Sequence, residues 1–73
     1  MERGRSRVYV WRERGVRHHL PHCHVEWADG SCVIEVDTMA VLAGRATPQA
    51  YQLVRDHQEE IRNAWRSLNN TQP

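Results

Sequence analysis

The sequence has no lysine, because all ten of its basic residues are arginines. Arginine makes bidentate contacts with phosphate and carboxylate groups, although codon usage in a GC-rich genome explains this composition equally well. Six arginines lie in residues 1–17 against two glutamates, whereas residues 18–73 carry four arginines against seven acids. We therefore expect a solvated surface, a disordered N-terminal arm, or an RNA- or DNA-binding patch near the front of the chain. The candidate binding residues are Arg12, Arg14 and Arg17.

Long apolar runs are also absent. A membrane-spanning helix needs about 20 consecutive apolar residues, and the arginine-rich start lacks the apolar stretch of a signal peptide. The sequence therefore predicts a cytoplasmic protein with no membrane partner. A chain of 73 residues can bury only one small core, so a homodimer or another partner would help to stabilise it.

A β-hairpin is the clearest structural signal. Two runs with strand composition, residues 22–28 and 31–37, are separated by Asp29 and Gly30. This dipeptide is the preferred centre of a two-residue type I′ turn. A turn centred there gives one apolar face, formed by Cys23, Val25, Trp27, Cys32, Ile34 and Val36.

The alternation of side chains places histidines and carboxylates on the other face of this hairpin. In the expected register His22 lies opposite Asp37. Likewise, His24 lies opposite Glu35. The sequence therefore predicts a histidine–carboxylate surface.

The sequence contains two cysteines, Cys23 and Cys32. In the expected register they share the apolar face about four residues apart, which is roughly 13 Å at strand rise. A disulfide needs Cα atoms within about 7 Å. We therefore expect two buried thiols, as in a reducing compartment.

The remaining segments predict a small α+β domain. Residues 8–11 have strand composition, and Thr47 and Pro48 predict a helix start. Residues 38–44 fit either a fourth strand or a helical turn. Apolar residues at helical spacing predict one helix ending near residue 70, with its buried stripe formed by Ala50, Tyr51, Val54, His57, Ile61, Ala64, Trp65 and Leu68.

The expected architecture is an antiparallel sheet of three or four strands, with one C-terminal helix packed on one face. This single domain covers residues 8–70. A basic arm, residues 1–7, precedes it in an ordered or disordered form, and residues 71–73 are a tail.

Four of the five histidines fall within residues 18–24. His22 and His24 would point to one side of a strand, about 7 Å apart. They could act as base and acid on RNA. Alternatively, together with His18 and Glu35 they could bind a divalent metal such as zinc. Surface histidines paired with carboxylates are the third interpretation, so the sequence leaves open whether the protein is an enzyme.

Three stretches of the chain resemble a family of short bacterial and archaeal proteins, the domain of unknown function numbered four-one-six-zero. These stretches are residues 18–24, residues 25–27 with 33–37, and residues 59–61 with 64–65, and the resemblance covers residues 8 to 68. The histidines that match the family motif are His18, His22 and His24. The family commonly has proline in place of Leu20 and a large apolar residue in place of Cys23.

Members of this family often stand beside another small protein in arrangements that look like toxin–antitoxin or mobile-element modules. The resemblance therefore implies a small cognate protein as partner. The leading hypothesis is a binding component that uses the histidine face or the sheet edge. The alternatives are a metal-independent ribonuclease-type toxin using His22 and His24, and a metal-binding regulatory module.

Overall fold

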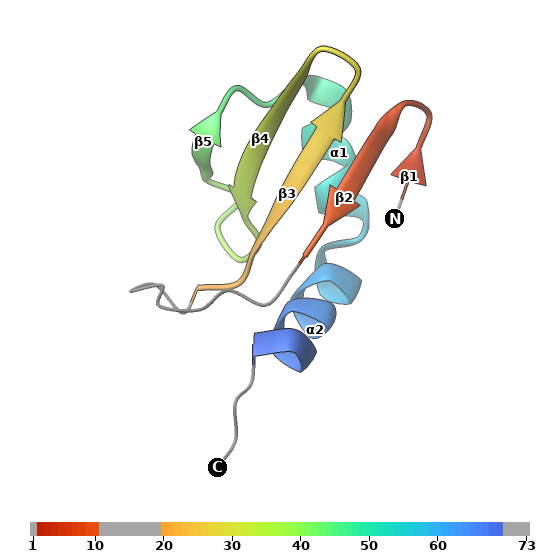
Figure 1. The fold of residues 1–73 in the computed structure, drawn as a ribbon. Coiled ribbons are helices and arrows are strands. Elements are labelled where there is room, and N and C mark those ends of the chain that lie inside the picture. Colours follow the sequence, from red (N-terminus) through yellow and green to blue (C-terminus); the bar gives the residue numbers. More distant parts are fainter. Residues whose placement is uncertain (1, 11–19, 70–73) are drawn as a thin grey trace.

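Five strands and two helices make up the fold in the computed structural model, which describes residues 2–10 and 20–69 (Figure 1). In chain order the elements are β1 (Glu2–Arg3), β2 (Ser6–Tyr9), β3 (His22–Trp27), β4 (Gly30–Glu35), β5 (Val41–Gly44), α1 (Pro48–Asp56) and α2 (Gln58–Asn69). The strands form one antiparallel sheet in the order β1-β2-β3-β4-β5. The α+β class is therefore confirmed, with more strands and one more helix than expected.

The segment expected to be a basic arm contributes to the sheet. β1 pairs with β2, with Glu2 opposite Arg7 and Arg3 opposite Ser6. β2 in turn pairs with β3, where Val8 lies opposite Val25. The sheet therefore begins before residue 8. The predicted tail at residues 71–73 lies outside the described residues.

The register between β3 and β4 differs from the expected one by two residues. The turn is centred on Ala28 and Asp29, and Gly30 is the first residue of β4, opposite Trp27. Within the described chain, positive φ angles occur at Met39, Gly4 and Gly44, and none occurs in this turn. A type I′ turn needs positive φ angles at both central residues, so the prediction of this turn type at Asp29 and Gly30 is wrong.

The close approach of Trp27 explains why a glycine stands at position 30. A Cβ atom at Gly30 would lie 2.9 Å from Nε1 of the Trp27 indole. The missing side chain lets the indole lie against the backbone of β4. This glycine therefore serves cross-strand packing, and the turn falls one residue earlier than expected.

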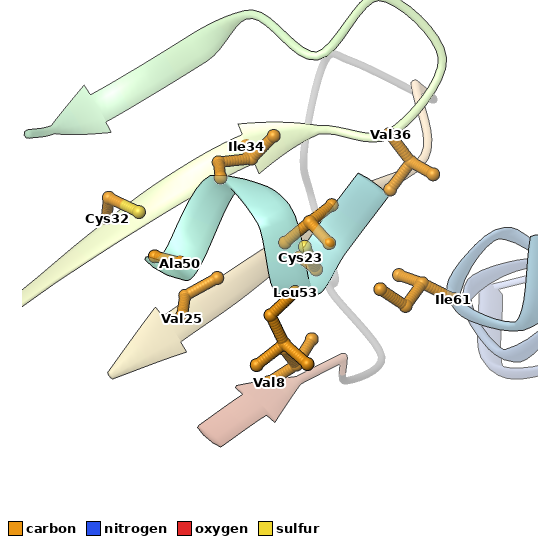
Figure 2. Close-up of a cluster of buried hydrophobic side chains, with 10 residues drawn as sticks. Val8, Cys23, Val25, Cys32, Ile34, Val36, Ala50, Leu53 and Ile61 are labelled. Atoms are coloured by element: carbon orange, nitrogen blue, oxygen red, sulfur yellow. The ribbon is translucent and has the colours of Figure 1, made fainter. Parts of the chain in front are cut away.

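A shift of two residues leaves every side chain on its expected face, because side chains alternate with a period of two. The apolar face of the hairpin is confirmed, since Cys23, Val25 and Ile34 are completely buried and Cys32 is 2 % exposed. Figure 2 shows these side chains gathered with residues of the helices. The cross-strand partners change, however, and this affects the histidine site.

Helix α1 covers the apolar face of the sheet (Figure 1). The side chain of Thr47 accepts a hydrogen bond from the backbone N–H of Ala50 at 3.1 Å, and Pro48 is the first helical residue. The predicted helix start is thus confirmed. Ala50, Leu53 and Val54 are completely buried against the strands.

The helical region is interrupted at His57, where φ is −118° and ψ is 23°. Beyond this break Ile61 and Trp65 are buried, as predicted, whereas Ala64 and Leu68 are exposed. The prediction of one continuous helix is therefore wrong, and so is the placement of Ala64 and Leu68 on its buried stripe. Within residues 2–10 and 20–69, no helix is long and apolar enough to span a bilayer.

Two polar contacts fix α2 to the loop that follows β4. The side-chain amide of Gln58 donates to the carbonyl oxygen of Val36 at 2.5 Å. The Nε of Arg62 donates to the Asp37 carboxylate at 2.6 Å. These contacts hold α2 at the end of the sheet, in line with its position in Figure 1.

Cys23 and Cys32 are free and buried, as predicted. Because the register is shifted, they lie on diagonal positions of the β3–β4 ladder, with Cys23 opposite Ile34 and Cys32 opposite Val25. The expected four-residue separation is therefore wrong. Burial, together with the neighbouring Cys32, raises the pKa of Cys23 from 9.0 to about 12. Burial also raises the pKa of Cys32.

We expect the free energy of unfolding to fall as the pH rises above about 9. The Cys23 thiol loses its proton near pH 9.0 in the unfolded chain but keeps it to about pH 12 in the folded chain. The unfolded state is therefore increasingly favoured across this window. Urea denaturation between about pH 8 and about pH 11 measures the fall, and Cys23→Ala should show a smaller one. Equal falls in both proteins would contradict this assignment.

Candidate functional site

His22 and His24 lie two residues apart on β3, on the face of the sheet opposite to that of Cys23. Their ring centroids are 5.6 Å apart, with the rings edge to face. His22 is buried, with 9 % of its surface exposed, and His24 is half-buried. The strand therefore brings both imidazoles to one side, with His24 the more accessible.

The carboxylates expected opposite these histidines lie elsewhere. The two-residue shift puts Glu35 opposite His22, so the predicted cross-strand pairing of His24 with Glu35 is wrong. Asp37 lies beyond the end of β4 and forms an ion pair with Arg62 at 2.6 Å. The predicted pairing of Asp37 with His22 is therefore wrong as well.

The loop after β4 holds Glu35 in place. Its carboxylate accepts a hydrogen bond from the Thr38 hydroxyl at 2.8 Å. Its backbone N–H donates to the Ala40 carbonyl, and its carbonyl accepts from the Met39 N–H, each at 2.8 Å. Met39 has a φ of 65°, which closes this tight loop. Glu35 is consequently a fixed carboxylate, 9 % exposed, at the end of the sheet.

The surroundings of His22 define its tautomer. Its Nδ1 lies 2.9 Å from the carbonyl oxygen of Leu20. A carbonyl can only accept, so Nδ1 carries the proton, and in the neutral ring Nε2 is the unprotonated nitrogen. The indole of Trp65 lies beside the ring, with 6.0 Å between the centroids. A ring held in this way can accept a proton or a metal through Nε2, or serve packing alone.

Several predicted site residues cannot be placed. His18 and the three candidate binding arginines, Arg12, Arg14 and Arg17, lie outside the described residues, so their roles stay predictions. The part of the chain that the structure describes contains no group of three or more His, Cys, Asp or Glu side chains that could hold a metal ion. The metal-binding hypothesis therefore needs a ligand outside the described residues, for which His18 is the predicted one.

The sequence analysis named a sheet edge as a binding surface, and the structure shows β5 at one edge of the sheet. β5 pairs with β4 on one side, and the described residues supply no strand on its other side. All four residues of β5 are exposed, including Val41 at 43 % and Leu42 at 53 %. A register shift leaves Leu42 without a partner residue in β4. The signal was the apolar run at residues 41–43, which fitted either a strand or a helical turn.

These features define a small α+β domain with an exposed apolar edge strand and a pair of histidines on a central strand. Residues 6–66 match the family described as Domain of unknown function (DUF4160). Because the match covers most of the chain, the chain belongs to this family, as the resemblance indicated. No curated protein and no solved structure matches the chain.

Proposed function

We propose that the chain is the binding component of a two-protein, toxin–antitoxin-like module, and that it binds a small cognate protein by strand addition along β5. The exposed edge carries this proposal. The outer backbone N–H and C=O groups of an edge strand are a template for another strand. Val41 and Leu42 add apolar surface that a partner strand would cover.

The composition of β5 supports this function. Edge strands avoid association through lysine, proline, an inward-pointing charge or a β-bulge. β5 has an irregularity at Leu42, but its sequence Val-Leu-Ala-Gly carries no lysine, proline or charge. The opposite edge strand, β1, is two residues long and offers little backbone for pairing. The partner strand is therefore expected at β5 and not at β1.

The accessibility of the histidines favours binding over catalysis. A ribonuclease-type mechanism needs both imidazoles to reach the 2′-hydroxyl and the leaving oxygen of one phosphodiester. His22 is 9 % exposed and lies beside the buried Trp65. Strand addition at β5 needs no access to this position.

Co-purification with the product of the adjacent gene tests the proposal. We expect a stable complex for the wild type, measured by size-exclusion chromatography with light scattering. Leu42→Arg, which adds a charge to the exposed edge, should weaken the complex at least about tenfold. Leu68→Arg is the matched control, because Leu68 is also exposed, at 44 %, but lies on α2. This control should bind like the wild type.

Three results would overturn the proposal. The first is that Leu42→Arg and Leu68→Arg both disrupt the complex, or that neither does. The second is a homodimer of the chain alone that Leu42→Arg dissociates, because the edge would then pair two copies. The third is RNA cleavage that is abolished by His24→Ala and unaffected by Leu42→Arg, which would assign the protein to the ribonuclease class.

A further inference from the structure

A hollow of about 430 Å³ lies between the β1–β2 turn and the start of α1 (Figure 1). The volume falls within the range of small-molecule sites, about 300–1,000 Å³. Neither the histidine pair nor the β5 edge uses the residues around it. The residues that line it include Arg5 and Ser6 of the β1–β2 hairpin, Trp27 on β3, and Thr47, Gln49 and Gln52 at the start of α1.

The side chains of Ser6 and Trp27 project from the face of the sheet that α1 covers. Ser6 is buried and precedes the exposed Arg7, in the alternating pattern of β2. Trp27 lies two residues after the buried Val25 and packs against the same core. The strand residues of the hollow therefore come from a single face of the sheet, with α1 beside them.

Trp27 gives the hollow an aromatic wall that is positioned before any ligand binds. Its indole lies against Gly30, where a Cβ atom would be 2.9 Å from Nε1. The residue is half-buried and still borders the hollow. A ring fixed in this way can pack against a second aromatic ring with little loss of conformational freedom.

The hollow has a positive charge at its rim. Arg5 is exposed in the β1–β2 turn, and it is the one charged residue among the described residues that line the hollow. A guanidinium group binds a carboxylate through two parallel hydrogen bonds. The charge of the site therefore favours an anionic ligand.

Ser6 supplies a buried hydroxyl that is available to such a ligand. The residue is 8 % exposed, and within residues 2–10 and 20–69 its hydroxyl makes no hydrogen bond. Buried polar groups are nearly always hydrogen-bonded in folded proteins. A ligand oxygen in the hollow would give this hydroxyl a partner.

The first turn of α1 leaves one backbone N–H for the same ligand. The N–H groups of Ala50 and Tyr51 both donate to Thr47. Pro48 has no N–H, so in the part of the chain that the structure describes the N–H of Gln49 is the one left for a ligand. Gln49 lines the hollow, and the start of a helix favours negative charge.

We propose that this hollow binds a small aromatic carboxylate, with its ring against the Trp27 indole and its carboxylate held by Arg5, Ser6 and the start of α1. The hollow is at the β1–β2 side of the sheet, away from β5. The inference therefore extends beyond the proposed protein-binding function, and each can fail without the other.

Titration of the full chain with indoleacetate, followed by NMR at the indole N–H resonances, tests this site. We expect a saturable shift at Trp27 and none at Trp65, which lies on α2. Tryptophol has the same ring without the carboxylate, and it should bind at least about tenfold more weakly because it cannot form the charged hydrogen bonds. No saturable shift at Trp27, or equal binding of the two compounds, would overturn the proposal.

Two variants test the residues that hold the carboxylate. Arg5→Gln and Ser6→Ala should each weaken the binding of indoleacetate at least about threefold. Arg7→Gln is the matched control, because it makes the same change of charge on the opposite face of β2. It should change the affinity by less than about twofold.

Equal weakening by Arg5→Gln and Arg7→Gln would show attraction to net charge alone and overturn the site. Wild-type affinity in both Arg5→Gln and Ser6→Ala would overturn it as well. Ser6 is buried, so thermal unfolding checks that Ser6→Ala is folded. Arg5→Gln changes an exposed turn residue and decides the outcome if Ser6→Ala does not fold.

Discussion

Leu53→Ala is expected to lower the free energy of unfolding by about 2–5 kcal/mol. Leu53 is completely buried between α1 and the sheet (Figure 2). Its truncation removes apolar contacts and leaves a cavity that the paired strands cannot easily close. A domain of this length has about 4–11 kcal/mol of stability in total. The variant should therefore lose a large fraction of it, and thermal unfolding should shift by about 4–8 °C for each kcal/mol.

Urea denaturation of Leu53→Ala and Leu68→Ala measures this effect with a matched pair. The same atoms are removed in both variants, but Leu68 is 44 % exposed. The control should therefore stay within about 0.5 kcal/mol of the wild type. If Leu53→Ala lost no more stability than the control, α1 could not be packed on the sheet as described.

The sequence predicted those features of the fold that depend on residues adjacent in the chain. The start of α1 followed from Thr47 and Pro48, because capping depends on adjacent residues. The buried face of the β3–β4 hairpin followed from alternation, which is unchanged by a shift of two residues. The pairing of β1 with β2 was not predicted, because its strands are short and rich in arginine.

Tertiary packing determined what the sequence alone could not predict. In the observed register of the hairpin, the indole of Trp27 lies against Gly30, a cross-strand contact that turn preferences do not include. The break at His57 has no proline or glycine to mark it. It separates one helix that covers the sheet from another fixed at the sheet's end by the Arg62–Asp37 ion pair.

In the candidate site, too, the features that depend on adjacent residues were predicted and those that depend on strand register were not. Placement of His22 and His24 on one side of β3 required only the alternation of a strand, and the structure has them there. Their acidic partners depended on the register, so Glu35 lies opposite His22 and Asp37 contacts α2 instead. A two-residue shift thus keeps the composition of a face while changing which groups can exchange a proton.

Gly44→Ala is expected to destabilise the pairing of β4 with β5 more than any other glycine-to-alanine change that we consider. Gly44 has a φ of +74°, a conformation that costs a residue with a Cβ about 1–3 kcal/mol. In addition, a Cβ at this position would meet the carbonyl oxygen of Ser31, which belongs to the backbone of β4. The central strand cannot move without disturbing its pairing with β3, so the strain falls on β5.

Gly4→Ala is the matched control, because it separates the two contributions. Gly4 also has a positive φ, +60°, but a Cβ there would have no neighbour within 4 Å. It should therefore show only the conformational cost of about 1–2 kcal/mol, while Gly44→Ala exceeds it. Urea denaturation measures the difference in the free energy of unfolding between the two variants, and hydrogen exchange shows whether the loss of protection lies at β5. Equal losses would mean that β5 does not approach Ser31 closely, and they would weaken the case for β5 as a fixed template for a partner strand.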